Sequence, residues 1–133
     1  MSFLLDTHVW IWTQESPGAI GAKARALLET TAEDVCVSTV STLEIARLVA
    51  GGLLELKGSL ERWVRSAVDS LEARSIDVDH RVAIEAYKLP GKFHKDPADR
   101  MLVATARLGD LTLVTADERI LSYRPVRTLD ARR

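Results

Sequence analysis

Short apolar runs alternate along this chain with longer segments of helical periodicity, and that alternation restricts the folds open to it. The apolar runs cover residues 3–5, 35–37 and 111–114, and a weaker run covers 75–78. Near-continuous apolar runs are typical of strands covered on both faces of a sheet. The segments with helical periodicity are 21–31, 41–50, 60–73, 81–89 and 98–108. Strands that alternate with helices imply crossover connections, so the sequence predicts an α/β fold: a three-layer α/β/α sandwich with a central parallel sheet.

Composition narrows the class of protein further. The chain has 133 residues, of which 47% are hydrophobic, so we expect one folded domain over residues 1–133 rather than a disordered chain. No apolar run approaches the roughly 20 residues that a membrane-spanning helix needs, and the start of the chain lacks the basic segment of a signal peptide. The single cysteine, Cys36, cannot form an intrachain disulfide. We therefore expect a cytoplasmic protein with no membrane partner and with Cys36 in its core.

Acidic side chains stand where the predicted strands lead into helices. Asp6 follows the first apolar run, Glu44 lies in the first turn of the helix after the second, Asp99 opens the helix at 98–108, and Asp117 follows the last run. Ligands of open parallel sheets bind beyond the carboxyl ends of the strands, so these side chains should converge. Carboxylates gathered there would repel one another unless a cation lay among them. The oxygen-only ligand set favours Mg²⁺, with Mn²⁺ as the other option.

Helix capping is the competing explanation for each acid taken singly. Asp6 and Asp117 could be N-caps, and Ser41 with Glu44 has the spacing of a capping box. Only the convergence of all the acids at one edge of the sheet favours a metal site over capping.

Two of the acids at the last long helix can be told apart. Asp96 precedes Pro97, which is a strong N-cap signature because proline suits the first helical position. If Asp96 caps the helix, Asp99 one turn later is left to face the cleft.

Four segments together carry a family resemblance: FLLDTHVW at 3–10, Ser38 to Glu44, DPADRMLVATA at 96–106 and LVTAD at 113–117. They resemble the PIN-domain family, and more closely its VapC-type toxin ribonucleases from toxin–antitoxin pairs. The match extends over essentially the whole chain, with the acids in the expected order and spacing.

The resemblance implies a site and an activity. The family's acidic quartet, which is both catalytic and metal-binding, carries over onto Asp6, Glu44, Asp99 and Asp117, and its hydroxyl positions onto Thr7 and Thr115. We assign direct metal binding to Asp6 and Asp99, a shared metal or an oriented water to Asp117, and the nucleophilic water or a second ion to Glu44. The two threonines would fix the carboxylates by hydrogen bonds. The expected activity is Mg²⁺-dependent cleavage of RNA phosphodiester bonds.

Candidate substrate contacts surround these acids. His8 stands where many family members have asparagine, so it either touches substrate or only packs. Near Asp99, the side chains of Lys92, His94, Lys95 and Arg100 either bind phosphate or form a solvated loop. Trp10 and Trp12 either stack on unpaired bases or pack in the core, and packing is the favoured interpretation.

Partners follow from the resemblance as well. It implies an RNA substrate, often a tRNA or rRNA loop, a homodimer, and a cognate antitoxin whose extended segment occupies a groove near the site. The apolar stretch at 48–54 is a candidate for that groove, for the dimer contact or for ordinary core packing.

Two other functions compete with the nuclease. A phosphatase of the haloacid-dehalogenase type would use Asp6 as nucleophile, but it needs a second aspartate where this chain has His8. A PIN-fold module could instead bind RNA or protein without cutting.

The net charge of −1 does not exclude a nucleic-acid partner. Setting the four acids aside leaves 15 acidic against 18 basic side chains, a mildly basic remainder. The chain therefore predicts local RNA binding in which metal, rather than bulk charge, supplies most of the phosphate recognition.

Overall fold

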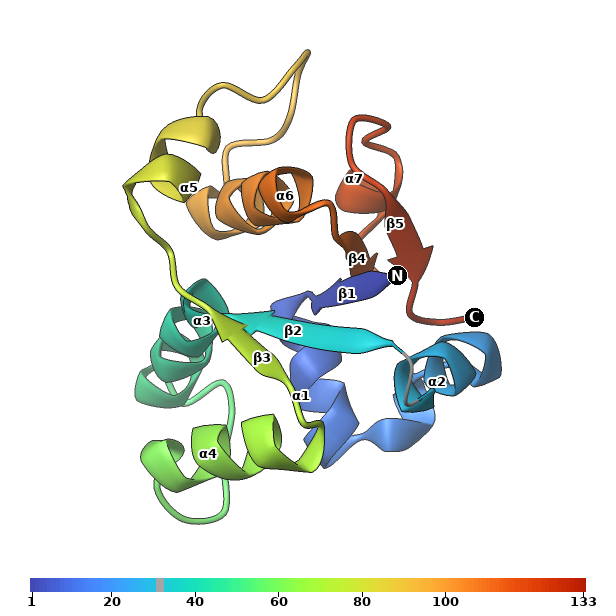
Figure 1. Cartoon of the computed structure of the whole chain (residues 1–133). Coiled ribbons are helices and arrows are strands. Elements are labelled where there is room, and N and C mark those ends of the chain that lie inside the picture. The colour runs from blue at the N-terminus through green and yellow to red at the C-terminus, as the bar shows by residue number, and fades with distance from the viewer. Residues whose placement is uncertain (31–32) are drawn as a thin grey trace.

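A computed structural model describes residues 1–30 and 33–133 (Figure 1). In chain order its elements are β1 (Ser2–Leu5), α1 (Thr7–Glu15), the 3-10 turn η1 (Pro17–Ala19), α2 (Ala22–Glu29), β2 (Asp34–Ser38), α3 (Thr39–Ala50), α4 (Leu60–Ser70), β3 (Arg74–Ile76), α5 (His80–Glu85), α6 (Pro97–Gly109), β4 (Thr112–Thr115), α7 (Glu118–Leu121) and β5 (Thr128–Asp130).

The strands form one sheet in the order β3-β2-β1-β4-β5, and every neighbouring pair is parallel. Helices cover both faces, with α5 and α6 on one side and α1, α2 and α4 on the other (Figure 1). The predicted α/β/α sandwich is confirmed. Because all strands run the same way, the carboxyl ends of the central strands β2, β1 and β4 meet at one edge of the sheet.

Alternate side chains of each strand enter two different cores. In β1, Phe3 and Leu5 pack with α1 and α4, whereas Leu4 packs with α6. In β2, Cys36 lies on the α6 side and is fully buried, as predicted. The central strands are therefore apolar on both faces, which is why they appear in the sequence as uninterrupted runs.

Two tryptophans pack together in the core below the sheet. Trp63 of α4 packs edge-on against Trp10 of α1, with ring centroids 5.3 Å apart and planes at 61°. Both side chains are buried. The pair fastens α1 to α4 under the sheet, at the geometry that aromatic rings prefer.

Element boundaries differ from the sequence prediction in several places. The helix predicted at 21–31 is Ala22–Glu29, and its last predicted residue, Thr31, lies outside the described residues. The third apolar run is shifted by one residue to Thr112–Thr115. The weak run at 75–78 forms β3, Arg74–Ile76, which is an edge strand of the sheet. The prediction omitted α1, α7 and β5.

The apolar stretch at 48–54 is largely ordinary packing. Leu48, Val49 and Leu54 contact the core shared by α1 and α4, while Leu53 is 75% exposed. Within the part of the chain that the structure describes, no helix is both long enough and apolar enough to span a bilayer.

Candidate active site

A cleft of about 380 Å³ opens at the carboxyl edge of the sheet. The residues that line it are Asp6, His8, Trp12, Glu44, Arg47, Asp96, Asp99, Ala116, Asp117 and Arg119. All four acids predicted to converge therefore do so, from the ends of β1 and β4 and from helices α3 and α6.

Asp6 is held at the floor of the cleft by two hydrogen bonds. It caps α1, and its Oδ1 accepts from the backbone N–H of Thr7 at 2.7 Å. Its Oδ2 accepts from the hydroxyl of Thr115, at the end of β4, at 2.6 Å. The Asp6 residue is 7% exposed, and this burial raises the pKa of its carboxyl despite the two donors. Capping and site formation are thus compatible, because each uses a different oxygen.

Glu44 reaches the cleft from the second turn of α3, not the first. The helix begins at Thr39 and is capped by Ser38, whose Oγ accepts from the N–H of Val40 at 3.1 Å. The predicted capping box between Ser41 and Glu44 is therefore wrong, because the helix starts earlier than its apolar pattern.

The hydroxyl of Thr7 holds Glu44 instead. It donates to Glu44 Oε1 at 2.5 Å and lies 2.8 Å from the Ser41 hydroxyl. Burial is the main cause that raises the pKa of Glu44, and nearby Asp99 and Asp6 add to it. Thr7 and Thr115 thus make the hydrogen bonds to carboxylates that were expected of them.

At the start of α6 the two acids divide as predicted. Asp96 is the N-cap, and its Oδ1 accepts from the N–H of Asp99 at 3.1 Å. Asp99 is 8% exposed and faces the cleft, where its Oδ2 lies 2.6 Å from Nε2 of His94. Burial raises the pKa of Asp99, while the hydrogen bond to His94 opposes that rise.

Asp117 differs from the other three acids. It caps the short helix α7 and is paired with Arg119, whose Nε lies 3.2 Å from Oδ1 and whose Nη2 lies 3.0 Å from Oδ2. These bonds lower the pKa of Asp117. The same Nη2 is 3.9 Å from Asp99 Oδ2, so Arg119 lies across the mouth of the site.

The electrostatics of the cleft suit a cation. Asp6, Glu44 and Asp99 each have a raised pKa, and in each case a neighbouring carboxylate contributes to the rise. A divalent ion would relieve both the burial and the repulsion. Within residues 1–30 and 33–133, no three acidic, histidine or cysteine side chains are close enough to ligate one ion together. The donor set still fits Mg²⁺, which takes one or two protein carboxylates and keeps several of its waters.

Comparison with known proteins gives the family. The family model described as "PIN domain" matches residues 3–124. The chain belongs to the PIN-domain family. A curated relative, Ribonuclease VapC22 of Mycobacterium tuberculosis, is 32% identical over 121 residues, which is 91% of each chain.

Solved structures share the PIN fold. A chain of the DNA-bound VapBC of Salmonella typhimurium superposes with a TM-score of 0.69 at 21% identity, covering 98% of both chains. A chain of a toxin–antitoxin complex from Klebsiella pneumoniae gives a TM-score of 0.65 at 17% identity, covering 96% of both. The resemblance inferred from the sequence motifs is confirmed.

The structure places the predicted substrate residues of this PIN domain in different surroundings. His8 is exposed and lines the cleft, and Lys95 is exposed but is not among the lining residues. Arg100 is a correction: its guanidinium donates to the carbonyl oxygens of Ala86 at 3.0 Å and Phe93 at 2.9 Å. It fastens the segment before α6 instead of facing the acids.

Two lining residues, Arg119 and Arg47, were missed, and the contact made by His94 differs from the prediction. Arg119 was not considered, although its place two residues after a capping aspartate favours a local ion pair. Arg47 was also missed, although it follows Glu44 by one helical turn. His94 was expected either to bind phosphate or to lie in a solvated loop, whereas the structure places it on the Asp99 carboxylate.

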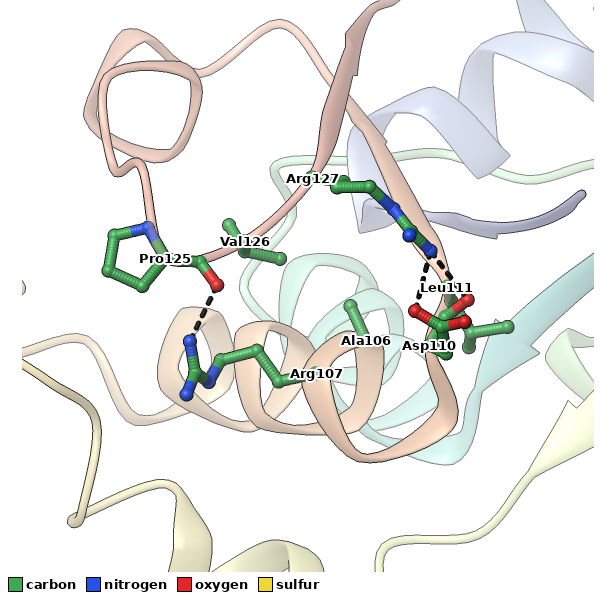
Figure 2. Close-up of a pocket in the computed structure, with 7 residues that line it drawn as sticks. All are labelled: Ala106, Arg107, Asp110, Leu111, Pro125, Val126 and Arg127. Atoms are coloured by element: carbon green, nitrogen blue, oxygen red, sulfur yellow. Dashed lines mark hydrogen bonds and ion pairs between the residues drawn. The ribbon is translucent and has the colours of Figure 1, made fainter.

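A second hollow, of about 260 Å³, lies at the opposite edge of the sheet (Figure 2). Its two arginines are already bonded within the PIN domain: Arg107 donates to the carbonyl oxygen of Pro125 at 2.5 Å, and Arg127 to that of Asp110 at 2.8 Å. The acids lie at the other end of the strands, so the candidate site is the acidic cleft.

Proposed function

We propose that this chain is a metal-dependent endoribonuclease and the toxin of a toxin–antitoxin pair. The observation that carries the proposal is the gathering of Asp6, Glu44, Asp99 and Asp117 in one cleft of a PIN fold. The 32% identity to a protein named a ribonuclease supports it over 91% of the chain. The reaction is hydrolysis of a phosphodiester bond in RNA.

Mg²⁺ is the proposed cofactor, and Mn²⁺ would serve as well because it prefers the same oxygen ligands. A bound ion would activate a water molecule and neutralise charge that develops on the phosphate. Asp6 and Asp99, the two most buried acids of the cleft, would hold it directly. Asp117 would share it or orient water, and Glu44 would position the nucleophilic water or a second ion.

The other residues of the cleft set the positions of these acids. The Thr115 hydroxyl fixes one oxygen of Asp6, the Thr7 hydroxyl fixes Glu44, and His94 fixes Asp99. Hydrogen bonds of this kind hold a carboxylate in one rotamer before the ion or the substrate arrives. Arg119 is already bonded to Asp117, so the guanidinium would compete with an ion for this carboxylate.

An antitoxin is the proposed protein partner, because the chain shares its fold with chains of toxin–antitoxin complexes. A hollow of about 570 Å³ adjoins the acidic cleft between α3 and α6, lined in part by Leu43 and Met101, and Leu43 is 67% exposed. An extended segment lying there would end beside Glu44. We propose a homodimer as the assembly, tRNA or rRNA as the substrate, and the reducing cytoplasm as the location that suits the lone buried Cys36.

The test is incubation of the purified chain with total RNA in Mg²⁺ or Mn²⁺, with and without EDTA. We expect cleavage that EDTA abolishes and that the Asp6→Asn and Asp99→Asn variants lack. Cleavage retained by both variants would exclude the proposed site.

The alternative is a PIN module that binds RNA or protein without cutting it. The pairing of Arg119 with Asp117 favours it, because that carboxylate is already neutralised from within the chain. RNA binding by gel shift, with no cleavage in either metal, would support this alternative over the nuclease.

A further inference from the structure

One wall of the acidic cleft is formed by side chains that are not carboxylates. His8 and Trp12 lie one turn apart on α1, and Arg47 lies one turn after Glu44 on α3. The hydroxyl of Thr7 joins the two helices by its bond to Glu44. Trp12 and Arg47 therefore lie about one turn beyond that junction on neighbouring helices, and both line the cleft.

The three tryptophans of the chain have different surroundings. Trp10 is fully buried and Trp63 is 9% exposed, and the indole nitrogen of each is buried without a hydrogen-bond partner among the described residues. Trp12 is half-buried: part of its ring packs on the core of α1 and α4, and part lines the cleft. Among the described residues, its indole nitrogen is not one of the buried nitrogens without a partner.

Trp12 also lacks an aromatic neighbour. Within residues 1–30 and 33–133, ring contacts join Trp10 to Trp63 and Phe93 to both His94 and Tyr123, and none involves Trp12. The ring therefore has surface available to a ligand inside the cleft. A flat indole of this kind binds the face of a nucleobase, and does so whatever the base.

Arg47, on the neighbouring helix α3, is a cation that lines the same cleft as Trp12. Among the described residues, it has no ion pair or side-chain hydrogen bond, whereas Arg119 across the cleft is engaged with Asp117. The side chain of Arg47 is exposed at the mouth of the cleft. A guanidinium without an acidic partner is suited to a phosphate, which it can bind through two parallel hydrogen bonds.

We propose that Trp12 and Arg47 form a subsite for one unpaired nucleotide next to the phosphate that is cut. The base stacks on the Trp12 indole, and Arg47 binds the phosphate that flanks it. The inference rests on the proposed function and deepens it by assigning the two residues that would hold one unpaired nucleotide of the RNA. A paired base cannot stack on the indole, because both of its faces are covered by its neighbours in the duplex.

Steady-state cleavage of a single-stranded RNA oligonucleotide tests the stacking half of the subsite. Trp12→Leu keeps an apolar side chain but removes the ring, and we expect KM to rise roughly 5- to 150-fold with kcat nearly unchanged. Trp12→Phe keeps a ring and should stay within a few fold of the wild type. Equal KM values for Trp12→Leu and the wild type, or a loss confined to kcat, would overturn the proposal.

Arg47→Ala tests the phosphate half, with Arg65→Ala as the matched control on an exposed face of α4. Loss of one phosphate contact should weaken binding and reduce the slope of log affinity against log salt by roughly 0.7 for a single strand. The control should leave the slope unchanged. Equal slopes for Arg47→Ala and the wild type would remove Arg47 from the subsite.

Tryptophan fluorescence supplies a readout that does not depend on cleavage. The Asp99→Asn background prevents cutting, and binding of the oligonucleotide there should quench emission because Trp12 meets the base. Adding Trp12→Phe should abolish the quench while fluorescence anisotropy still reports binding. A quench that persists in that variant would contradict the subsite.

These results also separate the subsite from the function on which it rests. No cleavage of any RNA by the wild type would be a failure of the proposed nuclease. Cleavage by the wild type, with Trp12→Leu and Arg47→Ala unaffected, would be a failure of the subsite alone. If both variants cleave normally but no longer bind a basic peptide, the wall recognises protein and the proposal is overturned.

Discussion

Arg119 holds the Asp117 carboxylate through two parallel hydrogen bonds, with its Nε on Oδ1 at 3.2 Å and its Nη2 on Oδ2 at 3.0 Å. The same guanidinium lies 3.9 Å from Asp99. A positive charge from the chain itself therefore occupies the side of the cleft that a metal ion would approach. The guanidinium is exposed, so solvent screens its ion pair with Asp117 and the pair costs little to break.

Removing this cation should strengthen metal binding. In Arg119→Ala, Asp117 is released, and we expect Mn²⁺ to bind a few fold more tightly, measured by calorimetry on the RNA-free protein. Arg132→Ala is the control, because Arg132 is bonded to Asp130 and Glu118 outside the cleft lining. Weaker Mn²⁺ binding by Arg119→Ala would mean that the guanidinium orders the site rather than competing for it.

Thr115 should matter although it cannot reach a substrate. It is fully buried and donates to Asp6 at 2.6 Å. Thr115→Val keeps the shape of the side chain but removes the donor, and we expect a 10- to 100-fold loss of metal affinity or cleavage rate. Thr115→Ser should retain most of both. A valine variant with wild-type metal affinity would show that Asp6 needs no such support.

Asp96 and Asp99, at the start of α6, allow a matched pair of substitutions. Asp99→Asn and Asp96→Asn each remove one negative charge, three residues apart, and asparagine preserves the N-cap at 96. We expect the first to abolish Mg²⁺-dependent cleavage and the second to retain most of it. Equal losses in the two variants would show that total charge in the cleft, rather than the position of Asp99, controls activity.

The contribution of the Asp96 cap to the stability of the fold can be measured separately. Asp96→Ala removes the acceptor for the N–H of Asp99, which should lower the free energy of unfolding by about 1 kcal/mol. Urea unfolding without metal measures the difference from Asp96→Asn. No difference between the two variants would mean that the cap contributes little to α6.

Much of this site could be predicted because residues that follow neighbouring parallel strands lie at the same edge of the sheet. Asp6 and Asp117 follow strands β1 and β4, which are neighbours, so their convergence needs only a parallel sheet. Pro97, which directly follows Asp96, indicated that Asp96 caps the helix and that Asp99 faces the cleft. Periodicity and strand order are properties of local sequence, and both are strong here.

The remainder depended on side-chain contacts that no local pattern encodes. The extra turn at the start of α3 was missed because Ser38 ends a strand and caps a helix at once. Arg100 resembles a phosphate ligand by its position next to Asp99, yet two backbone carbonyl groups hold it elsewhere. Which of two adjacent charged side chains faces a cleft is set by packing of distant segments, so proximity along the chain does not decide it.

Glu44 allows a test of the electrostatics by pH. Burial raises its pKa, so the folded protein binds its proton more tightly than the unfolded chain does. The free energy of unfolding without metal should therefore fall, through this group, as pH rises from its ordinary value of 4.5 through the raised value. Glu44→Gln retains an acceptor for Thr7 without the charge. We expect this variant to exceed the wild type in melting temperature at pH 7 in EDTA, with the difference shrinking on acidification. A wild type that gained stability over Glu44→Gln with rising pH would reverse the sign and show that nearby cations, not burial, dominate the cleft.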